Sequence, residues 1–216
     1  MKNLKVWATA ALMAVSANAS AQFVNSGGGS KTTVNSEGWN SLMLEWNPSS
    51  FSPKHGDSES FTGLSLVYNN ANGLTSSVPL FLEWGIGAQY SFASDFKDID
   101  DITFSMLSAK VPFSLIYKFD IPNSTISLMP NAGLDFRFNI FAKLSDDDDS
   151  ANLFDKDDMD DMGSNTWNRF QVGWHIGLKA RFGESFMLGA AYGSDFSEIS
   201  DDVHIHTPSI SLGFTF

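Results

Sequence analysis

Two histidines near the C-terminus are the first residues whose types and spacing could do chemistry. His204 and His206 stand two positions apart and close to Asp201 and Asp202, so they could supply metal ligands or an acid–base pair. In an extended segment both imidazoles would point to the same side. Two ligands do not complete a metal site, however, and no serine, histidine and acid elsewhere have a spacing that identifies a nucleophile with its base. The sequence therefore identifies no catalytic residue and indicates no cofactor.

An acidic run is the second chemical feature. Nine aspartates lie between residues 146 and 161, and carboxylate oxygens are ligands that Ca²⁺ prefers. The EF-hand spacing fails, because counting from Asp158 puts Met162 at position five and Arg169 at position twelve. Two interpretations remain: a looser divalent-cation site, and a solvated, flexible loop whose like charges repel one another. The candidate ligands are Asp155, Asp157, Asp158, Asp160 and Asp161.

The elements that must position these residues are indicated by alternation with period two. From Thr125 to Leu144 the even positions are apolar and the odd positions include charged residues, and the segment from Thr166 to Gly183 repeats this pattern. Successive side chains of a strand point to opposite faces, so both segments predict strands with one apolar and one charged face. Weaker alternation brings the predicted number of strands to eight, with the others at 37–46, 59–69, 78–92, 103–120, 185–194 and 207–216.

The predicted connections alternate in length, which is typical of an antiparallel up-and-down barrel with short turns on one side and long loops on the other. The short connections are Asn69–Ser77, Asp120–Ser124 and Gly183–Glu184. The long ones are Asn47–Ser58, Ser94–Asp101, Ser145–Asn165 and Asp195–His206. The acidic run then forms the third long loop.

The composition of the two faces indicates that lipid lies outside this barrel and charge inside it. The apolar face carries no charge through the strand centres, aromatic residues gather towards the strand ends as in membrane girdles, and the strand lengths match a tilted span. The glycines of the opposite face suit the narrow interior of an eight-stranded barrel. The predicted lumen charges are Glu45, Glu83, Lys110, Lys118, Asp135, Arg137, Lys143, Arg169, His175, Lys179 and Arg181.

These lumen charges have two interpretations. Charges of both signs in a narrow lumen should pair, since an isolated buried charge is strongly unfavourable. The excess of basic over acidic residues in the set instead suggests a narrow conduit or an anion-favouring site, although eight strands leave little open space.

The N-terminus predicts export. Residues 1–21 combine two lysines, an apolar stretch from Val6 to Val15 and the small residues Ala19 to Ala21, which is the pattern of a cleaved signal peptide. Residues 22–36 are expected to be a flexible lead-in, and residues 37–216 to form the barrel. The chain has no cysteine and therefore no disulfide, and its formal net charge of −12 argues against a nucleic-acid partner.

The closing segment, Pro208 to Phe216, carries a family resemblance. Together with the signal peptide and the eight alternating strands, it resembles the outer-membrane protein β-barrel domain family, PorT-like members included, over about residues 37–216. The segment from Trp167 to Trp174 is also similar to such proteins. The resemblance implies a location in the outer membrane of a Gram-negative bacterium, with its lipids as surroundings. It also implies a closing strand that the barrel-assembly machinery reads as a signal through Ile210, Leu212, Phe214 and Phe216.

Membership in such a family specifies architecture and hardly any activity. The leading hypothesis is a non-enzymatic barrel whose acidic external loops form an interaction surface on the outside of the cell. It rests on the charged clusters outside the strands, whose residues are not spaced as those of a catalytic site. The alternatives are a narrow, porin-like pore, an accessory barrel of a secretion machine, and a lipid-modifying or proteolytic barrel enzyme. For that enzyme, His175, His204 and His206 would be the bases to test.

Overall fold

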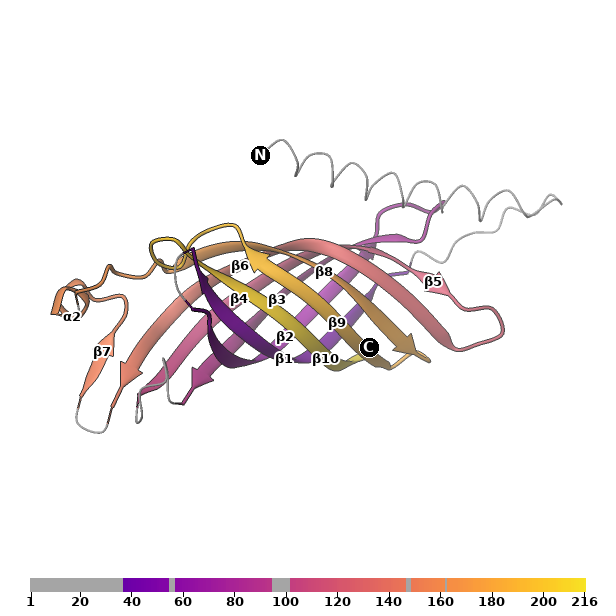
Figure 1. Ribbon diagram of the computed structural model, residues 1–216. Coiled ribbons are helices and arrows are strands. Elements are labelled where there is room, and N and C mark those ends of the chain that lie inside the picture. Colours follow the sequence, from indigo (N-terminus) through magenta and orange to yellow (C-terminus); the bar gives the residue numbers. More distant parts are fainter. Residues whose placement is uncertain (1–36, 55–56, 95–101, 147–148, 162) are drawn as a thin grey trace.

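The chain folds into a closed barrel of eight long antiparallel strands. The structure is a computed structural model that describes residues 37–54, 57–94, 102–146, 149–161 and 163–216. Strands that follow one another along the chain pair with each other, and the last pairs with the first (Figure 1). The predicted fold class is thereby confirmed. The predicted signal peptide, 1–21, and the predicted lead-in, 22–36, lie outside the described residues.

The barrel strands are β1 (Trp39–Pro53), β2 (Glu59–Gly73), β3 (Leu80–Ala93), β4 (Thr103–Tyr117), β6 (Ile126–Ser145), β8 (Phe170–Phe182), β9 (Phe186–Asp195) and β10 (Val203–Thr215). Two short strands, β5 (Phe119–Asp120) and β7 (Ser150–Asn152), pair with β6, and α2 (Lys156–Asp161) follows β7. Within the described part of the chain, no helix has both the length and the apolar character needed to cross a membrane.

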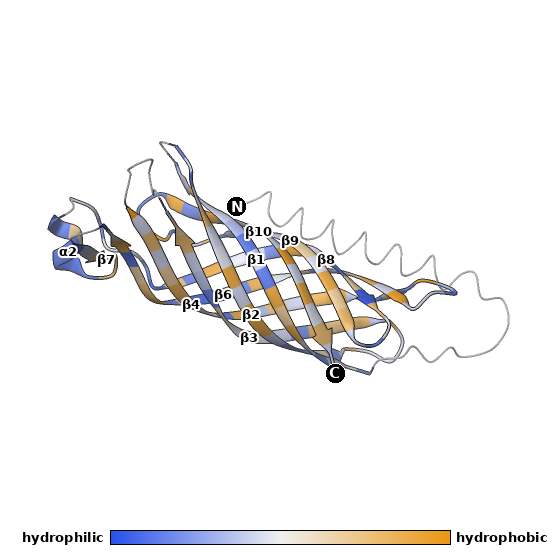
Figure 2. Cartoon of the chain, turned by 90° about the horizontal axis from the view of Figure 1, so that it is seen from below, coloured by the Kyte–Doolittle hydropathy of each residue, from blue (hydrophilic) through white to orange (hydrophobic). Residues whose placement is uncertain are grey.

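Alternation along each strand separates an apolar outside from a largely polar inside. On β2, Leu64 and Leu66 are 46% and 53% exposed, whereas Ser65 and Val67, which alternate with them, are each 1% exposed. Large apolar side chains are exposed in this way on all eight barrel strands, and Figure 2 shows hydrophobic stretches on the strands and hydrophilic residues on α2. A water-soluble barrel would not expose so much apolar surface, so this surface is suited to lipid.

Hydrogen-bonded polar side chains mark the edge of the apolar surface on the side of the short turns. The Asn40 Oδ1 atom accepts hydrogen bonds from the Tyr68 hydroxyl and from Asn70 Nδ2, both at 2.8 Å. The Trp84 indole N–H donates to Asn70 Oδ1 at 3.2 Å. Tyr and Trp with one polar and one apolar end are typical of a membrane–water interface, so this cluster places that interface near Asn70.

Two of the predicted long loops are shorter in the structure, because strands extend into them. The prediction of a loop at 47–58 was wrong for its first part: β1 continues to Pro53, and Ser50 pairs with Ser60 of β2 and with His206 of β10. The sequence conceals this extension because its outward positions, Pro48, Ser50 and Ser52, carry no large apolar side chain. Likewise β9 ends at Asp195 and β10 begins at Val203, inside the segment predicted as a loop at 195–206.

A β-bulge in β6 reverses the alternation near the long loops. Leu107 pairs with Phe141 and Ser108 pairs with Asn139, so Ile140 is an extra residue opposite β4. Beyond the bulge Ala142 faces inward and is fully buried, whereas Lys143 is exposed. The placement of Lys143 among the lumen charges was therefore wrong, because a uniform period of two does not hold across a bulge.

The interior has three layers along the barrel axis. The end with the short turns is filled by an apolar group, which we call the turn-end cluster: Trp39, Met43, Ala71, Phe81, Ile116, Met129 and Met187. The end with the long loops is filled by the loop-end cluster: Phe51, Phe61, Phe104, Met106, Ala142, Leu153, Met159, Ile199 and Ile205. Polar and charged side chains occupy the layer between them. The sequence did not reveal either cluster.

The third long loop is folded, in its described part, onto the barrel mouth. Strand β7 extends the sheet beside β6, and Leu153 and Met159 are buried in the loop-end cluster. Trp167, which was predicted to lie in a strand, belongs to this loop; its ring centroid lies 5.2 Å from that of Phe51. The expected flexible loop is thus folded in its described residues, because apolar side chains between the aspartates anchor it, whereas Asp155, Asp157 and Asp160 are exposed to solvent as expected.

Candidate functional site

The polar middle layer of the lumen encloses a cavity of about 80 Å³. Charged side chains from β1, β3, β4, β6, β8 and β9 line one part of its wall. Half of the other lining residues are small residues of β9 and β10: Gly189, Ala190, Ala191, Gly193, Ser194, Thr207, Ser209 and Ser211. Because these residues fill little volume, they leave the space that the cavity occupies.

Three ion pairs span this cavity layer. Lys110 Nζ lies 2.8 Å from Glu45 Oε2, and Lys179 Nζ lies 2.5 Å from Glu83 Oε1. Arg137 forms the third pair, with Asp195. Each pair joins strands that are not neighbours in the sheet. The structure thus brings five of the predicted lumen charges together, with Asp195 in addition.

Asp195 is a lumen residue that sequence reasoning missed, because it was assigned to a loop. The sequence could have indicated its place in the lumen, because residue 195 continues the series of odd positions of β9 that face inward. The cavity is therefore lined by four acidic residues and by the three cationic residues Lys110, Arg137 and Lys179, together with His175. The basic excess on which the anion-favouring interpretation rested is not present around the cavity.

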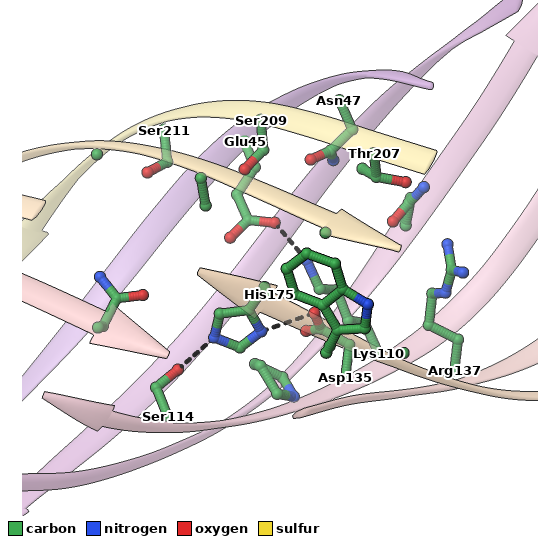
Figure 3. Close-up of a pocket in the computed structure, with 18 of the residues that line it drawn as sticks. Glu45, Asn47, Lys110, Ser114, Asp135, Arg137, His175, Thr207, Ser209 and Ser211 are labelled. Atoms are coloured by element: carbon green, nitrogen blue, oxygen red, sulfur yellow. Dashed lines mark hydrogen bonds and ion pairs between the residues drawn. The ribbon is translucent and has the colours of Figure 1, made fainter. Parts of the chain in front are cut away.

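A chain of hydrogen bonds links a serine, a histidine and an aspartate in the same layer. The Ser114 hydroxyl lies 2.8 Å from His175 Nε2, and His175 Nδ1 lies 2.8 Å from Asp135 Oδ2 (Figure 3). The sequence could not reveal this constellation, because β4, β6 and β8 bring the three residues together from positions 61 and 40 apart. The alternation along β4 could have placed Ser114 on the inward face, but many other serines of this chain also face inward and could not be told apart from it.

Two predicted lumen charges lie outside the cavity, near the short turns. Lys118 Nζ is 3.0 Å from Asp120 Oδ1, and the Arg181 guanidinium lies 5.5 Å from the ring centroid of Trp39. Burial raises the pKa of the Asp120 carboxyl, but hydrogen bonds from Ser127 and Lys118 outweigh burial and hold that pKa below its ordinary value. This turn therefore gains stability above the ordinary carboxyl pKa and loses it as pH falls through the lowered one.

Arg169, like Lys143, is a predicted lumen residue that does not line the cavity. Its side chain is exposed, donates from Nη1 to the carbonyl oxygen of Ile140 at 2.9 Å, and stands 4.3 Å over the centroid of the Phe154 ring. It thus ties the third loop to the bulge in β6. Its assignment to the lumen was wrong, because β8 begins one residue later.

The acidic loop uses part of its carboxylates to bind its own backbone. Asp155 Oδ1 accepts from the amide of Asp157 at 2.9 Å, as an N-cap of α2 does, and Asp158 Oδ2 accepts from the amide of Asn152 at 2.8 Å. Among the described residues, no three histidine, aspartate or glutamate side chains gather in a way that could hold a metal ion. The proposed cation site thus finds no support in this part of the loop.

The two histidines near the C-terminus, His204 and His206, contact different partners. His204 Nε2 lies 3.8 Å from Glu198 Oε1, and His206 Nδ1 lies 3.3 Å from the Tyr192 hydroxyl. Asp202 instead pairs with Lys54, and Asp201 accepts from Asn165. The spacing in sequence therefore does not produce the metal site or acid–base pair that it suggested.

The closing strand β10 presents the predicted assembly residues to the outside. Ile210, Leu212, Phe214 and Phe216 are all exposed on the outer face, and Leu212 and Phe214 pair across the seam with β1. That the assembly machinery reads these side chains stays a prediction.

The filled lumen has a direct consequence for conduction. Two apolar clusters and three ion pairs obstruct the path along the axis, so the purified protein in a planar bilayer should give no steady conductance, while a sixteen-stranded porin in the same bilayer should conduct. Steady single-channel steps that scale with protein concentration would contradict this prediction.

Three solved bacterial outer-membrane barrels are similar to this structure. Ail, the attachment invasion locus protein of Yersinia pestis, is 16% identical with a TM-score of 0.51, and the alignment covers 83% of this chain and 99% of Ail. Neisserial surface protein A is 15% identical with a TM-score of 0.48 over 82% of this chain and 97% of its own. The outer membrane enzyme PagL is 14% identical with a TM-score of 0.49, over 80% and 97%. At such identities the likeness to Ail shows the fold alone.

No curated protein matches the sequence significantly. A family model does match it, that of the outer membrane protein beta-barrel domain, over residues 7–216, which is nearly the whole chain. This match agrees with the closed barrel, its exposed apolar surface and its polar lumen. The chain therefore belongs to the outer membrane protein β-barrel domain family, and it is an integral protein of the outer membrane.

Proposed function

We propose that the protein is a rigid, non-conducting surface scaffold that binds a cationic partner outside the cell through its folded third loop. The observation that carries this proposal is the construction of that loop. Its apolar residues Leu153 and Met159 are buried in the barrel mouth, whereas Asp155, Asp157 and Asp160 are exposed around α2. A rigid acidic surface loses little conformational entropy when it binds, which favours recognition over a mobile tail of the same charge.

A surface of one charge sign attracts partners of the opposite sign and accelerates their encounter. The chain carries 25 acidic against 13 basic residues, and the acidic excess is densest in the third loop. We therefore assign the partner to the class of basic polypeptides. Ail is described as an attachment invasion locus protein, and attachment through external loops is a role that this barrel would also fit.

The binding of a fluorescent lysine nonapeptide to the protein in lipid nanodiscs tests the proposal. We expect Asp→Asn replacement at 155, 157, 160 and 161 to weaken binding by on the order of tenfold at low salt, and salt to weaken wild-type binding steeply. Asparagine retains the N-cap at position 155, so the loop should stay folded.

The matched control removes four charges elsewhere, at Asp57, Glu59, Glu198 and Asp202, which lie outside the third loop. It should retain most of the affinity. Equal losses in the two variants would mean that only net charge matters, and unchanged affinity in the third-loop variant would refute the assignment.

A further inference from the structure

We propose that Ser114, His175 and Asp135 form a nucleophilic site inside the lumen that cleaves small, uncharged esters. The three side chains come from β4, β8 and β6, whose backbones the barrel holds rigidly. Their two hydrogen bonds are both 2.8 Å long and run in sequence from hydroxyl to imidazole to carboxylate (Figure 3). Geometry of this kind, rather than sequence order, identifies a serine nucleophile with its base.

The direction of the hydrogen bonds follows from the partners. Asp135 can only accept when ionised, so His175 donates its Nδ1–H to that carboxylate, and its Nε2 lone pair faces the Ser114 hydroxyl. In this tautomer the imidazole can take the hydroxyl proton. Asp135 holds the ring in place and balances the positive charge that then develops on it.

The reaction balances without any further component. The Ser114 Oγ atom bonds to the ester carbonyl carbon while its proton passes to His175; the alcohol then leaves with that proton, and the acyl group remains on the serine. A water molecule next gives a proton to His175 and attacks the acyl carbon. The Ser114 oxygen leaves and regains a proton, and the carboxylic acid is released.

The surroundings of the triad define the substrate class. Ser114, His175 and Asp135 all line the cavity of about 80 Å³, whose size favours a small substrate. Lys110 and Lys179 line the same cavity, and each is paired with a glutamate. An ammonium group has three N–H donors, so a donor that the glutamate does not take would stabilise the oxyanion of the tetrahedral intermediate. The apolar clusters at both ends of the lumen disfavour the entry of ions.

Ser108 provides a matched internal control. It lies on the same strand β4, faces inward and is 1% exposed, against 4% for Ser114. Its hydroxyl, however, donates to Asn139 Oδ1 at 2.7 Å, and an amide oxygen is no general base. A hydrogen-bond chain that served only to fill the lumen would leave Ser114 no more reactive than Ser108.

The test uses methanesulfonyl fluoride on the full barrel folded in detergent micelles, with peptide mapping by mass spectrometry. Oγ forms a bond to sulfur, the S–F bond breaks, fluoride leaves, and the proton goes to His175. We expect Ser114 to be sulfonylated about 100-fold faster than Ser108, the lower end of what a positioned base contributes. His175→Gln should abolish this preference, whereas Ser108→Ala should leave the rate of Ser114 sulfonylation unchanged. Hydrolysis of methyl acetate, followed by NMR, should be lost in His175→Gln and retained in Ser108→Ala.

Equal or absent labelling of Ser114 and Ser108 in the folded wild-type protein overturns the proposal. This comparison is made within one molecule, so it holds even if the His175→Gln variant fails to fold. Peptide binding by the third loop does not involve the lumen, and the two proposals therefore fail independently.

Discussion

Replacing Arg137 with methionine should destabilise the barrel by about 3–5 kcal/mol, because the substitution leaves the Asp195 carboxylate buried without its partner. The side chains of the pair are only 6% and 5% exposed, so bulk water has little access to the carboxylate that loses the guanidinium. The free energy of unfolding in urea, measured in lipid vesicles by tryptophan fluorescence, checks this expectation.

The double variant Arg137→Met with Asp195→Leu separates the buried charge from the loss of packing. It should recover most of the stability, since replacing both members of a buried pair by apolar groups is often neutral or stabilising. Lys54→Met is the exposed control: its pair with Asp202 has side chains 67% and 58% exposed, and we expect a change below about 1 kcal/mol. A small effect for Arg137→Met alone would show that the lumen is wetter than the structure indicates.

Leu44→Arg should cost about 2–4 kcal/mol, or prevent insertion altogether, because it places a charge in the middle of the lipid-facing surface of β1. Leu44 is 48% exposed, and its cross-strand neighbours are Leu66 and Leu212. The measurement is the free energy of unfolding in vesicles, together with the fraction of protein that folds.

Ser52→Arg on the same strand is the matched control for this lipid-facing substitution. Ser52 pairs with His204 in the part of β1 that extends towards the long loops, so the arginine there should cost about 0–1 kcal/mol. Comparable costs at the two positions would be incompatible with a bilayer around Leu44.

The sequence predicted the barrel because period-two alternation survives wherever one face meets lipid and the other meets charge. The segment from Thr125 to Asn139 is the clearest case. The alternation becomes unreadable where both faces have the same polarity. Near the turns Met43 and Met129 face inward between outward apolar residues, so the alternation did not reveal the turn-end cluster. Near the long loops the outward positions are a proline and two serines, so the extension of β1 to Pro53 was missed.

The candidate site was less predictable than the fold because it depends on which strands face one another across the lumen. Alternation assigned Asp135 and His175 to the interior but could not indicate that β4 would bring Ser114 against them. Local irregularities of the strands caused the other errors in the predicted set of lumen charges. The single extra residue Ile140, for example, turns Lys143 outward. Asp195 was lost from the set because the end of β9 was placed one residue too early.

Cysteine scanning along β1 tests the central claim, that lipid surrounds the apolar face and the charged face is sealed inside. The chain has no cysteine, so each single variant from position 42 to 46 can carry one spin label in lipid vesicles. We predict that labels at positions 42, 44 and 46 collide with membrane-dissolved oxygen, while labels at 43 and 45 are shielded from it. Oxygen accessibility at positions 43 and 45, with water-soluble nickel chelate reaching 42, 44 and 46, would contradict the structure described above.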